Sequence, residues 1–201
     1  LVGNPNCGKT ALFNALTGAR QKVANYSGVT VEKKEGVFVG PQGTKVRVLD
    51  LPGTYSLRAR SPDEAVTRDI VLGKFVDESV PDAIVCVADA TNLHLGLRLV
   101  LELKKVGKPI ILALNMMDVA KKRGYDIDLN ILSKEIGVPV IPTIAIKKNG
   151  INDLVVAVEK EIEKYSAENT PNNHSNMQWK EPVAQEVRAY HREVERILCA
   201  A

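Results

Sequence analysis

The sequence lacks several features that mark membrane, secreted and nucleic-acid-binding proteins. No apolar run in its 201 residues approaches the roughly 18 residues that a membrane-spanning helix requires. The three cysteines, Cys7, Cys86 and Cys199, have neither disulfide nor metal-ligand spacing, which suggests a reducing compartment. The net charge is only +3, from 27 Lys and Arg against 24 Asp and Glu, so we expect no nucleic-acid partner.

The rest of the composition is that of an ordinary globular chain. It is 45% hydrophobic and 25% charged, which is enough apolar material for one sizeable core. Strand and helix patterns alternate over residues 1–165, which predicts a mostly parallel sheet with helices on both faces. We expect strands at 1–2, 33–39, 45–51, 83–88, 109–115 and 138–143, and helices at 9–17, 93–106 and 151–165.

The pattern changes after Tyr165. Residues 166–176 are polar, contain Pro171 and have no periodic apolar face, so we expect a linker at 166–180. Beyond it, residues 181–198 have the apolar spacing of an amphipathic helix. One helix cannot bury such a face alone. Residues 181–201 are therefore expected to begin a second, helical domain or to dock elsewhere.

The most specific motif is a G-x-x-x-x-G-K-[ST] sequence near the first residue, which we call the phosphate loop. Its residues are Gly3, Asn4, Pro5, Asn6, Cys7, Gly8, Lys9 and Thr10. The glycines allow backbone N–H groups to curl around phosphate oxygens, while Lys9 reaches the β- and γ-phosphates and Thr10 offers its hydroxyl to Mg²⁺. The helix that follows directs its N-terminal dipole at the same anion.

Two more motifs follow apolar strands. The first consists of Asp50, Leu51, Pro52 and Gly53, in which the carboxylate suits Mg²⁺ and the glycine N–H suits a γ-phosphate. The second consists of Asn115, Met116, Met117 and Asp118. The last carboxylate can accept both the ring N–H and the exocyclic amine of guanine, a pairing that adenine cannot offer. Each motif alone is also common as a turn or a helix cap, but the three in this order predict a guanine nucleotide-binding fold.

The segments between these motifs are expected to sense the nucleotide. Residues 25–32 include Gly28, Val29, Thr30, Val31 and Glu32, and Thr30 is the candidate to bind Mg²⁺ only when a γ-phosphate is present. Residues 54–69 have the composition of a mobile second switch, with a helix beginning at Pro62. A base-supporting loop is expected at 143–146, where the backbone N–H groups of Ile144, Ala145 and Ile146 would reach the guanine carbonyl.

Together these residues resemble the cytosolic G domain of the bacterial ferrous-iron transport protein B family, FeoB. The resemblance covers residues 1–165 and rests on Asn-Pro-Asn in the phosphate loop, Gly-Val-Thr-Val-Glu at 28–32 and Thr-Tyr-Ser-Leu at 54–57. It implies an α/β fold of the Ras-like P-loop GTPase type that binds GTP or GDP with Mg²⁺ and hydrolyses GTP slowly. In the family a helical domain follows, and then a membrane region that moves Fe²⁺ inward. The resemblance therefore implies a place at the cytoplasmic face of the bacterial inner membrane, and a homo-oligomer is possible.

The resemblance also implies a K⁺ site beside the phosphates. Asn6 would bind K⁺ together with backbone carbonyls near Ala24 and Tyr26, and the cation would neutralise charge between the β- and γ-phosphates. The residues expected to carry catalysis are thus Asn6, Lys9, Thr30 and Gly53. Two alternatives stay open at this point. One is a potassium-dependent GTPase of tRNA modification or ribosome assembly, and the other is a non-catalytic module that binds nucleotide to hold a partner.

Overall fold

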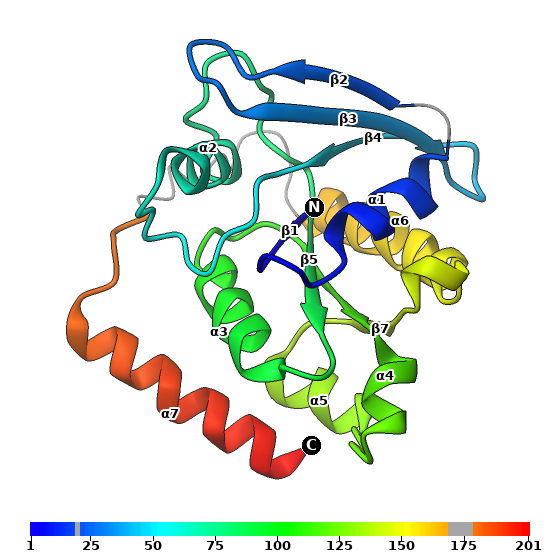
Figure 1. Cartoon of the computed structure of the whole chain (residues 1–201), viewed down its shortest axis with the longest axis vertical. Helices are drawn as coiled ribbons and strands as arrows, with labels where there is room; N and C mark the ends of the chain where they lie inside the picture. Colours follow the sequence, from blue (N-terminus) through cyan, green and yellow to red (C-terminus); the bar gives the residue numbers. More distant parts are fainter. Residues whose placement is uncertain (19–20, 169–178) are drawn as a thin grey trace.

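The structure is a computed structural model that describes residues 1–18, 21–168 and 179–201. Its centre is a parallel sheet with the strand order β1-β5-β6-β7 (Figure 1). The two central strands are buried on both faces, as the continuous apolar runs predicted. The bounds of the four strands are β1 (Val2–Gly3), β5 (Ile84–Asp89), β6 (Ile110–Asn115) and β7 (Val140–Pro142).

A second, antiparallel sheet has the order β2-β3-β4. The Leu51 N–H donates to the carbonyl of Leu1 at 3.2 Å, so β4 lies against β1 and the two sheets meet there. Strand β2 was not expected from the sequence. Four of its five side chains are exposed, and it pairs with β3 through backbone groups. Its sequence therefore lacks the run of buried apolar residues that predicted the other strands. The strands are β2 (Gln21–Asn25), β3 (Glu32–Val39) and β4 (Lys45–Asp50).

Helices cover both faces of the parallel sheet, so two cores form. Alternate residues of β5 divide between them: Ile84, Cys86 and Ala88 face one core, and Val85 and Val87 face the other. The first core includes α2, α3 and α5, and the second includes α1 and α6. The helices are α1 (Lys9–Thr17), α2 (Pro62–Val71), α3 (Leu93–Lys104), α4 (Met117–Lys122), α5 (Leu129–Ile136), α6 (Ile151–Glu168) and α7 (Ala184–Ala200), and η1 (Ala145–Lys147) is a 3₁₀ turn.

The amphipathic helix after the expected linker docks on the rest of the chain. α7 lies along α3 and α5 and buries Val194 and Ile197 in their core (Figure 1). α6 continues to Glu168, three residues into the expected linker. Residues 169–178 of that linker lie outside the described residues. No helix in the described part of the chain is long and apolar enough to span a membrane.

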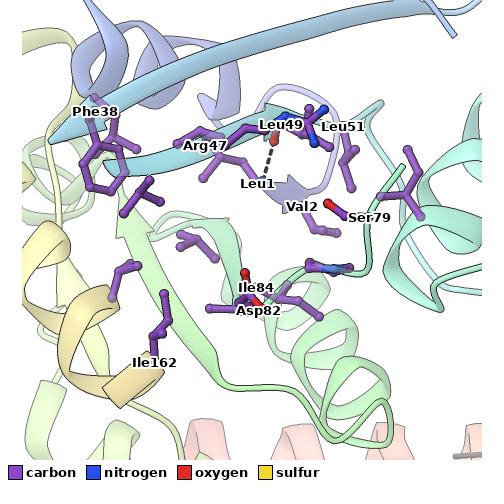
Figure 2. A pocket seen from close by; sticks show the side chains of 18 of the residues that line it. Leu1, Val2, Phe38, Arg47, Leu49, Leu51, Ser79, Asp82, Ile84 and Ile162 are labelled. Carbon is purple, nitrogen blue, oxygen red and sulfur yellow. Dashed lines mark hydrogen bonds between the residues drawn. The ribbon is translucent and has the colours of Figure 1, made fainter. Parts of the chain in front are cut away.

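A mainly apolar cavity of about 350 Å³ lies beside the junction of the two sheets. Figure 2 shows it surrounded by Phe38 of β3, Ile84 of β5 and Ile162 of α6, with the hydrogen bond between Leu1 and Leu49 at one side. None of the described residues that line it belongs to residues 3–10. The phosphate loop is therefore not part of this cavity.

Candidate functional site: a phosphate loop and a guanine-binding edge

The phosphate loop connects β1 to α1, and its backbone requires a left-handed conformation at two positions. Asn6 has φ 65° and Gly8 has φ 84°. A Cβ atom at Gly8 would lie 2.2 Å from the Nδ2 atom of Asn115, so only glycine fits. The loop therefore curls tightly ahead of α1, as the motif predicts, and directs that helix's N-terminus at its own concave side.

Lys9 and Thr10 both contact the carboxylate of Asp50. The Lys9 ammonium donates to Oδ1, and the Thr10 hydroxyl donates to Oδ2 at 2.9 Å. The Asp50 side chain is only 3% exposed, so this charge is held in place between its partners. A hydroxyl and a carboxylate oxygen at this separation are the hard oxygen ligands that Mg²⁺ prefers, so the residues fit a magnesium site.

The segment after Asp50 packs directly on the phosphate loop. Leu51 is buried, and a Cβ atom at Gly53 would lie 3.1 Å from Cγ of Pro5, so the two backbones approach closely. The Thr54 N–H donates to the Gly3 carbonyl at 3.0 Å. The Asn4 amide in turn donates to the Thr54 carbonyl at 3.2 Å. Gly53 is thereby fixed at the loop that would hold the phosphates.

Asn115 joins three loops at the carboxyl edge of the parallel sheet. Its Nδ2 atom donates to the Cys7 carbonyl at 3.0 Å. Its Oδ1 atom accepts the Ala145 N–H at 3.0 Å and the Thr143 hydroxyl at 3.3 Å. Asn115 is 3% exposed, so all these bonds are made away from water. The predicted bracing role is therefore seen directly in the structure.

Asp118 lies one turn further on, in the first turn of α4. Met116 turns the chain with φ 62°, and the partly buried Met117 begins the helix. The Lys147 ammonium lies 2.8 Å from Oδ2 of Asp118 and lowers the pKa of that carboxyl below its usual value. Asp118 is therefore ionised at neutral pH, the state that accepts two N–H donors.

The three residues expected to support the base lie in or beside η1. Ile144 precedes the 3₁₀ turn, Ala145 is buried, and Ile146 is 81% exposed. The Ala145 N–H is already used by Asn115. The loop is thus held beside Asn115 at the carboxyl edge of the sheet, and its contact with a base stays a prediction.

The expected first switch is folded back on itself. The Tyr26 N–H donates to the Val31 carbonyl at 3.0 Å, and Gly28 provides the left-handed turn between them with φ 78°. Tyr26 and Val31 are buried, Val29 is partly buried, and Thr30 and Glu32 are exposed. No hydrogen bond of the described residues joins Thr30 to Thr10 or Asp50, so its role as a magnesium ligand stays a prediction.

Sequence reasoning missed several residues that shape this site. Lys147, which ends η1, reaches Asp118 only through the fold. Thr143 begins the loop expected at 143–146, but its hydrogen bond to Asn115 had no signal in the sequence. Outside the site, Glu102 is the single charged residue in the run 99–103, and the fold buries it. Cys7 contributes its carbonyl, and burial raises the pKa of its thiol, so it is a packing residue and not a nucleophile.

Comparison with known proteins identifies the family. The family model described as ferrous iron transport protein B (FeoB_N) matches residues 1–158. The Fe(2+) transporter FeoB of Salmonella typhimurium LT2 is 44% identical over 160 residues, which are 80% of this chain and 20% of that protein. A Fe(2+) transport protein A/FeoB fusion protein of Porphyromonas gingivalis is 45% identical over 154 residues, which are 77% of this chain and 18% of that protein. The chain thus spans about a fifth of the length of these curated relatives.

Solved structures agree with this assignment. The cytosolic domain of T. maritima FeoB in its GMPPNP form has a TM-score of 0.78 and 34% identity, covering 100% of this chain and 96% of that one. A GDP form of the same domain also has a TM-score of 0.78, with 30% identity and the same coverage. The cytosolic domain of L. pneumophila FeoB has a TM-score of 0.73 and 45% identity, covering 79% of this chain and 61% of that one. With its family model, its relatives and its α/β G-domain fold in agreement, the chain belongs to the ferrous iron transport protein B family.

Proposed function

We propose that this chain binds guanine nucleotides, hydrolyses GTP and serves as the nucleotide-dependent regulatory part of a ferrous-iron transporter. One observation carries the proposal: Asn115 ties the phosphate loop, the start of α4 and the loop after β7 into one edge of the parallel sheet. Parallel strands present their carboxyl ends to a ligand at such an edge. The family and the nucleotide-bound forms of its T. maritima member support the same conclusion.

The residues of the site divide the work between the two ends of the nucleotide. Lys9 and the backbone of residues 3–10 bind the β- and γ-phosphates, and Gly53 meets the γ-phosphate with its N–H. Asp118 selects guanine, supported by the N–H groups of residues 144–146. Thr10, Asp50 and Thr30 would hold Mg²⁺. When bound, this ion supplies positive charge to the phosphate oxygens.

Potassium stimulation is the finer part of the proposal. Asn6 is exposed in the middle of the phosphate loop, where φ is 65°, and an amide oxygen is a ligand that suits an alkali cation, so the residue fits K⁺. Backbone carbonyls near Ala24 and Tyr26 would complete the site. When bound, K⁺ supplies charge between the β- and γ-phosphates, where an arginine finger acts in other GTPases.

The transporter assignment extends beyond this chain. The relatives are named as Fe(2+) transporters, and this chain matches about a fifth of their length. We assign it to the cytoplasmic face of the bacterial inner membrane, with the membrane region of the same parent protein as its partner. Residues 181–201 would begin the helical domain of that protein. A homo-oligomer is compatible with this assignment. Family membership favours the transporter assignment over a tRNA-modifying or ribosome-assembly GTPase.

The test is steady-state GTP hydrolysis in K⁺ and in Na⁺ at equal ionic strength, with Asn6→Ala beside the wild-type chain. Wild-type turnover should rise in K⁺, and Asn6→Ala should lose that rise while keeping its GDP affinity. Asn130→Ala, an exposed asparagine on α5, is the matched control and should behave like the wild type. Turnover in neither salt would leave a non-catalytic nucleotide-binding module. Turnover equal in both salts would remove the K⁺ site.

A further inference from the structure

The segment that follows Gly53 is held by a buried charge that the site described above does not use. Thr54 and Leu57 are 0% exposed and Ser56 is 9% exposed, although this stretch has the composition expected of a mobile switch. Thr54, Ser56 and Leu57 are therefore buried, while Tyr55 between them is 49% exposed. Beyond them, the expected switch becomes exposed again at Arg60.

Glu102 on α3 is the anchor of this segment. Its Oε2 atom accepts the Ser56 hydroxyl and the Leu57 N–H, both at 2.7 Å. Ser56 Oγ also accepts the Arg58 N–H at 3.0 Å, so the hydroxyl that Glu102 holds in turn holds the backbone two residues further along. Glu102 is 1% exposed, and hydrogen bonds accepted by a carboxylate are shorter and stronger than those between neutral groups.

The second carboxylate oxygen balances the charge. Oε1 of Glu102 lies 3.6 Å from Nε of Arg98, one turn earlier on α3, and neither atom has a hydrogen-bond partner among the described residues. One oxygen therefore holds the loop, and the other faces a cation that partly compensates the buried negative charge.

The other end of the same segment is fixed to the phosphate loop. Thr54 is bonded to Gly3 through its N–H and to Asn4 through its carbonyl. Gly53 lies immediately before this residue and only three positions before Ser56. Its N–H is thus oriented by a short segment in which Thr54, Ser56 and Leu57 are buried. This segment is clamped at both ends, by the phosphate loop and by α3.

We propose that Glu102 is a positioning residue for γ-phosphate recognition, because it fixes the segment that orients the Gly53 N–H. This inference rests on the proposed function and names the residue that lets the site distinguish GTP from GDP. Loss of the carboxylate leaves the Ser56 hydroxyl and the Leu57 N–H unpaired in the core, so the segment must shift to satisfy them. The GDP contacts, made by the phosphate loop and Asp118, do not depend on it.

The test measures affinities for GDP and for a non-hydrolysable GTP analogue, together with thermal melting, for the wild type and for Glu102→Ala and Glu102→Gln. In Glu102→Ala the affinity for the analogue should fall about tenfold relative to that for GDP, as expected for loss of a charged hydrogen-bond acceptor. Glu102→Gln keeps an oxygen acceptor and should restore the wild-type ratio to within about twofold.

The matched control is Glu159→Ala. Glu159 is also a buried glutamate with an unpaired oxygen, but it lies on α6 beside Gly40 in the turn between β3 and β4. This variant should melt lower and keep the wild-type ratio of affinities. If Glu102→Ala does not fold, Ser56→Ala removes one of the two bonds and should lower the ratio about threefold.

Two results would overturn the inference. One is a Glu102→Ala or Ser56→Ala protein with the wild-type ratio of affinities. The other is an equal loss of both nucleotides, which marks a structural role alone. A wild-type chain that binds neither nucleotide contradicts the proposed function itself, so the two failures are distinguishable.

Discussion

Replacement of Asn115 by alanine tests the joint between the three loops. The side chain contacts the Cys7 carbonyl, the Ala145 N–H and the Thr143 hydroxyl, all in the interior. Alanine leaves two backbone groups without partners. At about 1–2 kcal/mol for each unsatisfied buried group, Asn115→Ala should lower the free energy of unfolding by about 2–4 kcal/mol.

The assay is urea unfolding of the nucleotide-free chain, followed by circular dichroism. Asn130→Ala is the control, because Asn130 is exposed and should change the free energy of unfolding by less than about 0.5 kcal/mol. The same variants should be titrated with GDP, and Asn115→Ala should bind at least about tenfold more weakly because the phosphate loop and base loop lose their common support. A stability and an affinity both equal to the wild type would refute the bracing role.

Three further substitutions test an ion pair, a close backbone approach and the docking of α7. Lys147 lowers the pKa of Asp118, so their ion pair stabilises the fold above the ordinary carboxyl pKa of about 3.9 and is lost as pH falls below it. In Lys147→Met, the Asp118 pKa measured by NMR should rise toward that value. An unchanged pKa would exclude the ion pair. Gly8→Ala should lower the free energy of unfolding by about 2–4 kcal/mol, because of both φ strain and overlap with the Asn115 side-chain amide. At Gly18, no atom of the described residues lies within 4 Å of an added Cβ, so Gly18→Ala should lower it by only about 1 kcal/mol. Equal losses would contradict the close approach at Gly8. Ile197→Ala should lower the free energy of unfolding by about 2–4 kcal/mol, because its side chain is fully buried; a loss near zero would show that α7 does not dock.

The parts of the site that could be predicted are local motifs at the ends of strands. The phosphate loop begins within β1, Asp50 ends β4, and Asn115 ends β6. The apolar runs identified these strands, and the rule that ligands bind at the carboxyl ends of parallel strands brings the phosphate loop and Asn115 together. Asp50 joins them because β4 lies against β1. The helix predicted at 9–17 has the same bounds as α1, because the loop fixes its start.

The parts that could not be predicted depend on contacts between residues distant in the sequence. Glu102 meets Leu57 across 45 positions, and Lys147 meets Asp118 across 29. An acidic residue in a helix pattern indicates solvent by default, and only the fold places Glu102 in the core. Tyr26 is a similar case, since its ring packs edge-on against Phe75 with the centroids 5.5 Å apart and draws the first switch into the core.

In the proposed site, this edge of the sheet binds a guanine nucleotide through Asp118. The most direct test is calorimetric titration of GDP and xanthosine diphosphate into the wild-type chain and into Asp118→Asn. The wild type should bind GDP and reject the xanthine nucleotide, and the variant should reverse that preference, because its amide donates where the carboxylate accepts. An unchanged preference for GDP in Asp118→Asn would contradict guanine recognition by this carboxylate.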